Sequence, residues 1–276
     1  MQGINEPAEG RHPERSGGSN PLIPVRGKRV GRPPGGSFAT LRMAMVASSA
    51  LLLSPGLALA QVGHPPGDSP FRDIRKGHTI TALGGYFGGS GGAFNIGPHK
   101  GTVFGGRYDI RTGSTVQIGV GIAHGSLDRF IVNPFVALVN RRSGPVKQSV
   151  TFADISLQLN VTGGKSWNRL APFLAAGVGL AFAGGTPADT SRYEFGRKFY
   201  VAPSAGFRFF ISDRLHLRGE ARAVFWKLSY PTTFQSEPVE EPGTPDDPNA
   251  VVVGDNLSEW NASPWLQVGL GYSFSL

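Results

Sequence analysis

The chain has 276 residues, of which 40 are glycine, 22 are proline and none is cysteine, and its formal net charge is +8. This composition argues against a helical bundle and against a disulfide framework, and it allows one or two domains. Residues 61–276 carry 20 basic and 16 acidic side chains, so half of the net charge lies in the first 60 residues and does not indicate a nucleic-acid partner.

Residues 1–42 contain seven Arg and Lys residues, three Glu residues and many glycines and prolines, without a hydrophobic period. Such a segment cannot bury enough apolar surface to fold. It could be a basic arm that binds nucleic acid. We favour a disordered or mis-annotated extension, in which translation begins nearer to residue 43.

Residues 43–60 form the long uncharged apolar stretch of the chain. A basic residue precedes it, and Ala58-Leu59-Ala60 before Gln61 has the small-x-small form of a signal-peptidase site. A transmembrane helix is the alternative, but Ser54-Pro55-Gly56 interrupts the stretch. We therefore expect a signal peptide cleaved between Ala60 and Gln61, followed by a polar, proline-rich periplasmic linker over 61–76.

Eight later segments alternate between apolar and polar residues, which is the pattern of strands with two different faces. They are 79–86, 103–110, 116–123, 154–161, 172–180, 199–209, 215–225 and 266–276. In the last segment one face is purely apolar, made by Leu266, Val268, Leu270, Tyr272, Phe274 and Leu276. Its other face is mostly Gly and Ser, which solvate a surface poorly but fit a narrow interior. Small polar residues inside and large apolar residues outside are typical of a transmembrane barrel.

The segment 130–139 is apolar and could be a ninth strand. With eight strands, the connections alternate between long ones (88–101, 125–148, 183–196 and 229–262) and short ones (111–114, 162–168 and 212–214). Outer-membrane barrels show this asymmetry, with long extracellular loops and short periplasmic turns. We therefore interpret 130–139 as a hairpin extension above the membrane or a loop on the rim.

Aromatic residues fall near the expected strand ends, where an aromatic girdle would lie. They are Trp167, Trp226, Trp265, Tyr108 and Tyr272.

Residues 77–276 resemble the small eight-stranded outer-membrane barrels of the OmpA/OmpX type. The signal segment, the strand count and the alternating C-terminal strand carry the resemblance. It implies an all-β, antiparallel, up-and-down transmembrane barrel whose terminal strand is read by the barrel-assembly machinery. In that family the last residue is usually aromatic, whereas this chain ends in Leu276. No peptidoglycan-binding domain follows the barrel, so that activity does not carry over.

Charged residues are confined to the face expected to line the lumen, where they avoid the cost of facing lipid. They are Arg107, Asp109, Asp154, Arg208, His216, Arg218, Glu220 and Arg222. They could line a pore or a proton relay. Because eight strands enclose a space that side chains just fill, and buried charges must be paired, we favour an interlocked ion-pair network.

His124 and Ser126 lie where the third strand should emerge outside. They resemble the His-x-Ser of outer-membrane deacylases that trim lipid A, which need an acid to orient the His. The family's acid would fall near Val136 and Leu138, so a rim histidine is the preferred interpretation. The sequence contains no metal-binding pattern and no dinucleotide loop followed by a helix, so we expect neither a metal nor a cofactor.

The sequence predicts a non-enzymatic outer-membrane barrel that anchors and displays extracellular loops, for envelope integrity or surface contact. Loop 229–262 is the expected contact surface, since long loops on a rigid scaffold carry function. A narrow channel for small solutes and a lipid-A-modifying enzyme are the alternatives. Expected partners are outer-membrane lipid, lipopolysaccharide, the barrel-assembly machinery and an unknown surface ligand. We expect a monomer.

Overall fold

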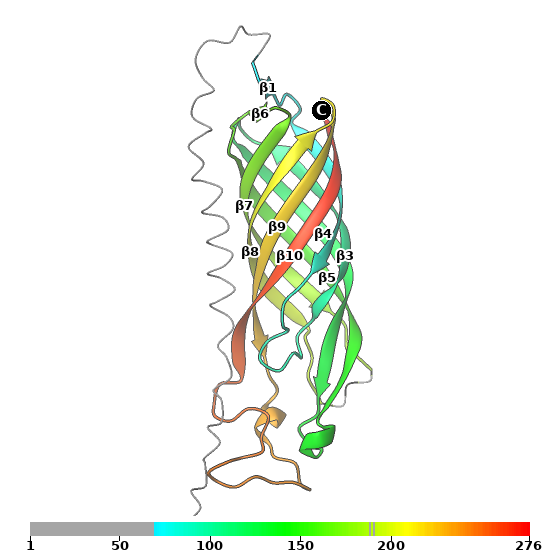
Figure 1. Ribbon diagram of the computed structural model, residues 1–276, viewed down its shortest axis with the longest axis vertical. Coiled ribbons are helices and arrows are strands. Elements are labelled where there is room, and N and C mark those ends of the chain that lie inside the picture. Colours follow the sequence, from blue (N-terminus) through cyan, green and yellow to red (C-terminus); the bar gives the residue numbers. More distant parts are fainter. Residues whose placement is uncertain (1–68, 188, 190) are drawn as a thin grey trace, which may run out of the picture. The chain divides into compact units, whose positions relative to one another are not determined.

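The computed structural model describes residues 69–187, 189 and 191–276. The expected N-terminal extension, the signal segment with its Ala60–Gln61 junction, and the linker as far as residue 68 lie outside the described residues. In the described part of the chain, antiparallel strands dominate, and eight long ones form a barrel (Figure 1).

The barrel strands are β2 (His78–Phe87), β3 (His99–Arg111), β4 (Val116–Val132), β5 (Arg142–Asn160), β7 (Leu170–Ala183), β8 (Arg197–Phe210), β9 (Leu215–Ser229) and β10 (Ser258–Phe274). Each strand pairs antiparallel with the barrel strand that follows it in the sequence, and β10 pairs with β2 to close the ring. Closure gives backbone groups partners within the sheet and removes free edges, as a hydrocarbon environment requires. The predicted eight-stranded up-and-down barrel is confirmed.

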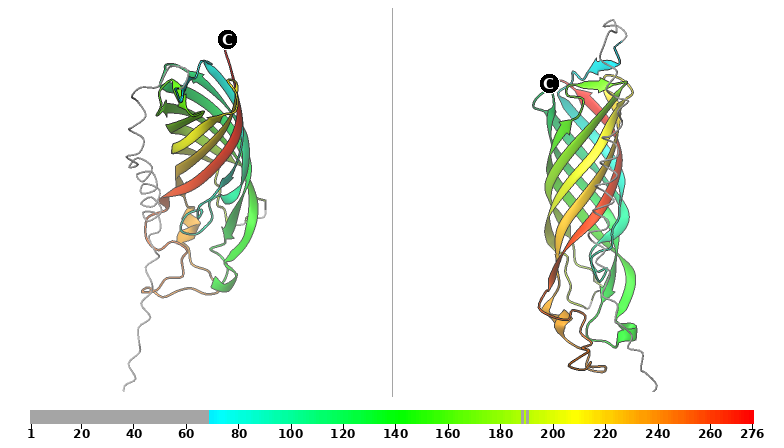
Figure 2. Two further views of the ribbon diagram at one scale, coloured as in Figure 1. Left: turned by 45° about the horizontal axis from the view of Figure 1, so that its top comes forward. Right: turned by 60° about the vertical axis from the view of Figure 1, so that its left-hand side comes forward.

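The strands cross the barrel obliquely in both further views (Figure 2). One end, which we call the turn end, carries the short connections 112–115, 161–169 and 211–214 together with the C-terminus (Figure 1). The other, which we call the loop end, carries the connections 88–98, 133–141, 184–196 and 230–257. The predicted alternation is present except at the β4–β5 hairpin, where the long strands leave a connection, 133–141, that is no longer than 161–169.

The hairpin of β4 and β5 extends farther at the loop end than its neighbours (Figure 1). Its register shifts between Arg129 and Ile131, which marks a β-bulge in the extension. Of the ambiguous segment 130–139, the first three residues continue β4, and Leu138 begins a short 3-10 helix, η2 (Leu138–Asn140). It is thus a hairpin extension, as expected, and it forms no separate strand.

Two short strands that the sequence did not predict cover part of the turn end. β1 (Phe71–Asp73) pairs with β6 (Lys165–Trp167), which lies in the connection between β5 and β7. Ile74 continues from β1 and packs with Ala171 and Phe210 in a small buried cluster. Residues 71–73 were expected to be linker, but their pairing with β6 requires a contact across 94 residues of sequence, which no local pattern encodes.

The outer face of the barrel is apolar, and its large side chains are exposed. Phe104 is 66% exposed, Ile122 62% and Val268 70%. In the part of the chain that the structure describes, no helix is long and apolar enough to cross a membrane.

Candidate functional site

The period of two along each strand directs one set of side chains inward and the other outward. All eight charged residues expected in the lumen lie inside the barrel with exposures of 7% or less. Their neighbours on the inner face include many small residues. At Gly119, for example, a Cβ atom would overlap the Asp109 carboxylate and the Arg107 guanidinium, so glycine makes room for the charged pair.

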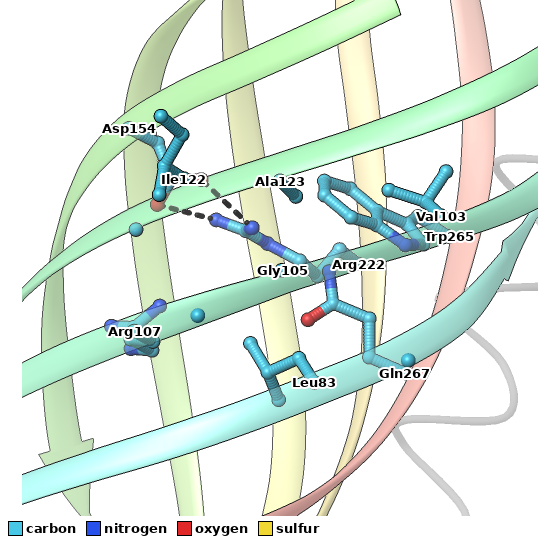
Figure 3. A pocket seen from close by; sticks show the side chains of 13 residues that line it. Leu83, Val103, Gly105, Arg107, Ile122, Ala123, Asp154, Arg222, Trp265 and Gln267 are labelled. Atoms are coloured by element: carbon cyan, nitrogen blue, oxygen red, sulfur yellow. Dashed lines mark hydrogen bonds and ion pairs between the residues drawn. The ribbon is translucent and has the colours of Figure 1, made fainter.

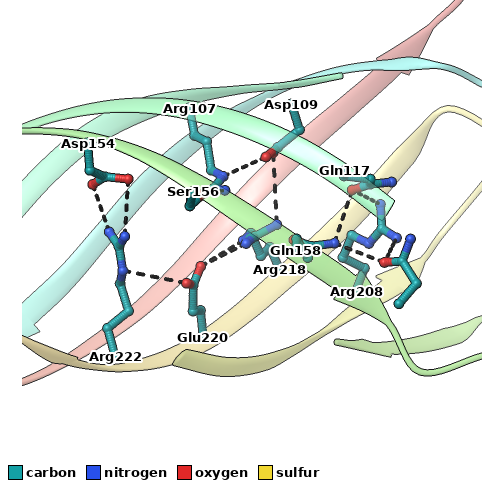
Figure 4. Close-up of polar contacts among 11 residues, drawn as sticks. Arg107, Asp109, Gln117, Asp154, Ser156, Gln158, Arg208, Arg218, Glu220 and Arg222 are labelled. Atoms are coloured by element: carbon teal, nitrogen blue, oxygen red, sulfur yellow. Dashed lines mark hydrogen bonds and ion pairs between the residues drawn. The ribbon is translucent and has the colours of Figure 1, made fainter. Parts of the chain in front are cut away.

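Six of these residues form a continuous chain of ion pairs from one wall of the barrel to the other (Figure 4). The chain runs in the order Arg107, Asp109, Arg218, Glu220, Arg222 and Asp154. Its closest contacts join Arg107 Nε to Asp109 Oδ1 at 2.7 Å and Arg218 Nη2 to Glu220 Oε2 at 2.9 Å. The links from Arg218 to Asp109 and from Arg222 to Glu220 are longer, at 3.9 and 3.6 Å.

The last link in the series of ion pairs is a bidentate pair between Arg222 and Asp154. Arg222 donates from Nη1 to Asp154 Oδ2 at 3.0 Å and from Nη2 to Asp154 Oδ1 at 3.1 Å. Tyr200 donates its hydroxyl to Asp154 Oδ2 at 3.1 Å. This geometry satisfies both carboxylate oxygens, which is the condition for burying an ion pair at tolerable cost.

Arg208 lies outside the chain of ion pairs and has amide partners instead (Figure 4). It donates to Asn160 Oδ1 at 2.7 Å and to Gln117 Oε1 at 3.2 Å, and Gln158 bridges the same two oxygens. Among the described residues no carboxylate lies within ion-pair distance of Arg208. The eight residues expected in the lumen therefore include four arginines and three acids, and Arg208 is the arginine without an acid. His216 lies farther toward the turn end. Its two ring nitrogens have no hydrogen-bond partner among the described residues, and its ring packs on Phe210.

An aromatic cluster fills the barrel on the loop side of the ion pairs. Phe87, Phe152, Trp226 and Trp265 pack with ring centroids 5.0–6.1 Å apart. The Arg222 guanidinium lies 5.3 Å from the Trp265 ring centroid and joins the two layers. The cluster continues into the loops through Ile96, Tyr193, Phe195, Tyr230, Phe234 and Val252.

This cluster corrects the expected aromatic girdle. Trp226 is fully buried and Trp265 is 3% exposed, so both point into the barrel and not toward the membrane interface. Tyr272 does lie on the outer face, at 46% exposure, and Trp260 is exposed on the same strand near the loop end. Trp226 is separated from Arg218 and Arg222 on β9 by even numbers of residues, so the alternation already indicated that it faces the lumen.

A small cavity lies where the ion pairs meet the aromatic cluster. It has a volume of about 10 Å³ and lies beside Arg107, Asp154, Arg222 and Trp265 (Figure 3). That volume is at the lower limit for one water molecule. The interior can hold charges in fixed positions, but this cavity has no room for a solute.

His124 lies on the outer face of β4, near the loop end, and bonds across to β5. Its Nδ1 is 2.9 Å from Thr151 Oγ1, and its Nε2 is 2.9 Å from Ser149 Oγ. Ser126, the serine of the alternative deacylase interpretation, is not one of the hydrogen-bond partners of His124. The structure also gives His124 no acid among the described residues, since nearby Asp128 pairs with Lys147 at 2.6 Å.

The loops are fastened to the barrel by buried polar contacts. Arg129, on the bulged part of β4, pairs with Asp189 of the 184–196 loop and lies over the Tyr193 ring. Tyr230 donates its hydroxyl to Glu259, which also accepts from the backbone N–H of Ala93 at 2.6 Å. Burial, and then the hydrogen bond to Glu259, raise the pKa of Tyr230. Burial likewise raises the pKa of Tyr193.

The C-terminal strand lies with Leu266, Val268, Leu270 and Tyr272 on the outer face, all exposed. The strand ends at Phe274, and Leu276 extends beyond it. A role of this strand in assembly stays a prediction. Among the described residues, no group of three or more His, Asp or Glu side chains could hold a metal ion.

Comparison with known proteins gives likenesses to solved structures only. No protein-family model and no curated protein matches the chain. Among solved structures, the outer membrane protein OprG from Pseudomonas aeruginosa is similar with a TM-score of 0.43 and 13% identity, over 73% of this chain and 98% of that one. Neisserial surface protein A is similar with a TM-score of 0.44 and 11% identity, over 71% and 97%.

A third similar structure is Ail, the attachment invasion locus protein of Yersinia pestis. It has a TM-score of 0.35 and 12% identity, over 72% of this chain and 99% of that one. The fold of the present chain rests on its own strand pairing.

Proposed function

We propose that this chain is an integral outer-membrane barrel that acts as a rigid anchor and displays its loops outside the cell. The support comes first from the apolar outer face. Isoleucine, leucine, valine and phenylalanine side chains are exposed on all eight barrel strands or at their ends, far more than a soluble surface carries. The strands are 10–19 residues long, enough for each to cross a hydrocarbon core while tilted.

The topology supports an orientation in which the long loops lie outside the cell. In outer-membrane barrels the short turns face the periplasm and the long loops face the exterior. The turn end, with the C-terminus and β1, is then periplasmic, and the four long loops are extracellular. Lipid and lipopolysaccharide surround such a barrel, the barrel-assembly machinery inserts it, and it works as a monomer.

The filled interior is the observation that favours an anchoring function over a channel. An ion-pair chain and an aromatic cluster lie one above the other, with a cavity of about 10 Å³ beside them. A solute would have to separate charges that hold one another in a medium of low dielectric. The interior therefore fixes the shape of the barrel and conducts nothing.

The outermost loops provide the contact surface. The backbone N–H of Leu138 donates to Glu241 at 2.9 Å, and Arg141 donates to the carbonyl of Asn249 at 2.6 Å, so the β4–β5 tip supports the 230–257 loop. Apolar side chains remain exposed on this joined surface, with Val139 at 87% and Val239 at 92%. A fixed surface with exposed apolar residues suits an extracellular ligand.

Three measurements test this function. In planar bilayers the purified protein should give no stepwise conductance, and the folded barrel should migrate differently on gels before and after boiling. Regular conductance steps would overturn the anchor in favour of the channel. Cells that display the barrel should lose surface contact when residues 237–255 are replaced by a short glycine-serine turn, while the barrel band persists.

A further inference from the structure

We propose that Ser149 and His124 form the catalytic pair of an acyl-ester hydrolase site on the outer face of the barrel. The substrate is an ester-linked acyl chain of a phosphorylated lipid in the surrounding leaflet. This inference goes beyond the proposed function, since no residue of the filled interior and none of the outermost loops takes part.

The first support is the hydrogen-bonding geometry. A serine nucleophile needs a base within hydrogen-bond reach, and the base needs a third group to orient it. Ser149 Oγ lies 2.9 Å from His124 Nε2, and Thr151 Oγ1 lies 2.9 Å from Nδ1. In a neutral imidazole that donates Nδ1–H to Thr151, Nε2 keeps its lone pair and accepts the Ser149 proton.

Strand register makes this arrangement rigid. His124 pairs with Thr151 across β4 and β5, and Ser149 is the next residue on the same outer face of β5. All three side chains therefore project from hydrogen-bonded backbone and not from a loop. Sites built on strands hold such distances well.

The second support is the position along the barrel. On the loop side of His124, Asp128 and Lys147 form an exposed ion pair. On the other side, Ile122 and Ile155 begin the exposed apolar belt, at 62% and 57%. Lipid esters join acyl chains to headgroups, so they lie at this boundary between apolar and charged surface.

The third support is an open groove beside the pair. It has a volume of about 570 Å³ and is lined by Ser149, Thr151, Phe182, Ala183, Gly184, Gly196 and Arg197. Cβ atoms at Gly184 and Gly196 would meet nothing within 4 Å, so this wall is unobstructed. Phe182 offers an apolar wall to an acyl chain, and Arg197 offers a cation to an anionic headgroup. Arg197 is thus a positioning residue.

The reaction balances with water as the second reactant. Ser149 Oγ attacks the ester carbonyl carbon while His124 Nε2 takes the hydroxyl proton. The bond from the carbonyl carbon to the alcohol oxygen then breaks, and His124 returns the proton to that oxygen. Water next attacks the acyl-serine with its proton passing to His124, and the bond to Ser149 breaks as His124 reprotonates it. The products are a fatty acid and the free alcohol.

Thr151 stands where serine hydrolases place a carboxylate. Its hydroxyl can orient the imidazole, but it adds no negative charge to stabilise the imidazolium that forms. The proposal therefore predicts a slow enzyme.

The test uses the full barrel purified from outer membranes. A fluorophosphonate probe is expected to label Ser149, and fatty acid release is measured by mass spectrometry. One arm uses vesicles of phosphatidylethanolamine, and the other uses vesicles containing lipid A. Release from either arm supports the site and identifies the source of the ester.

The variants separate chemistry from folding. Ser149→Ala and His124→Gln should each lower release by about 100-fold, the usual contribution of a nucleophile–base pair. Ser126→Ala is the matched control, since Ser126 lies opposite Ser149 on the same outer face without bonding His124. Arg197→Gln should raise KM and leave kcat unchanged. Thr151→Val should slow labelling, and Thr151→Ser should restore it.

The heat-induced gel shift reports folding of each variant. Undiminished release by folded Ser149→Ala would overturn the proposal. So would an absence of both labelling and release in the natural protein, labelling without release from either lipid, or an equal loss in Ser126→Ala.

Discussion

Arg222 and Asp154 face each other inside the barrel through two hydrogen bonds, of 3.0 and 3.1 Å, from β9 to β5. Both side chains are about 5% exposed. Neither strand neighbours the other in the sheet, so the pair holds opposite walls together.

Removing one partner of this pair should destabilise the barrel strongly. Asp154→Ala leaves the Arg222 charge buried without its best partner, at an expected cost of about 3–5 kcal/mol. The double variant Asp154→Leu with Arg222→Met should recover most of that loss, because no unpaired charge remains. The free energy of unfolding is measured in micelles by urea titration of tryptophan fluorescence. Equal losses in the single and double variants would contradict this account.

Deleting a phenylalanine should cost more inside the barrel than outside. Phe152 is fully buried in the aromatic cluster, so Phe152→Ala leaves a cavity and should cost about 3–5 kcal/mol. Phe104 is 66% exposed on the outer face, where surrounding acyl chains fill the space. Phe104→Ala should therefore cost less than half as much in the same urea titration. Equal costs would show that the cluster is not packed.

Breaking the pair between Arg129 and Asp189 should free the 184–196 loop. Both side chains are 3% exposed or less, and Asp189 also accepts from Ser191. Arg129→Gln should speed tryptic cleavage after exposed Arg192 at least about tenfold, since a broken buried pair costs about 3–5 kcal/mol. Lys147→Gln is the control, because an exposed pair such as Lys147–Asp128 contributes about 1 kcal/mol or less. Cleavage sites are identified by mass spectrometry.

Alkaline pH should loosen the connections at the loop end. Burial raises the pKa values of Tyr193 and Tyr230, so both phenols stay neutral in the folded loops where the unfolded chain would ionise. The stability that they contribute is complete below pH of about 10 and is lost as the pH rises beyond it. Absorbance of tyrosinate, followed with loop proteolysis, should show this coupling. Tyr230→Phe should reduce the pH dependence, and an unchanged profile would contradict the prediction.

The alternation of residues was sufficient to predict the eight strands, because lipid outside and a narrow interior inside impose different residue types on the two faces. The same phase indicated that His216, Arg218, Glu220 and Arg222 share one face, where the structure places them. Whether an aromatic side chain faces outward follows from its place in the alternation and not from its distance to a strand end, as the buried Trp226 shows.

Contacts between strands could not be read from the sequence. The partner of His124 depends on the register of β4 against β5, which the bulge at Arg129 and the turn after Val132 determine. The sequence offered Ser126, two residues away, only through the alternative His-x-Ser interpretation, whereas Ser149 is the residue within hydrogen-bond distance. The pairing of β1 with β6 depends in the same way on folding of the whole barrel.

In the proposed orientation, the extended β4–β5 hairpin also sets how far the protein reaches from the cell. From Ile122, at the upper edge of the apolar belt, β4 continues ten residues to Val132, a path of about 33 Å along the strand. Even at the usual tilt, much of that length is height above the acyl chains. In that orientation the apex that carries Val139 lies above the acyl chains, so a partner too bulky to approach the membrane surface can still touch it.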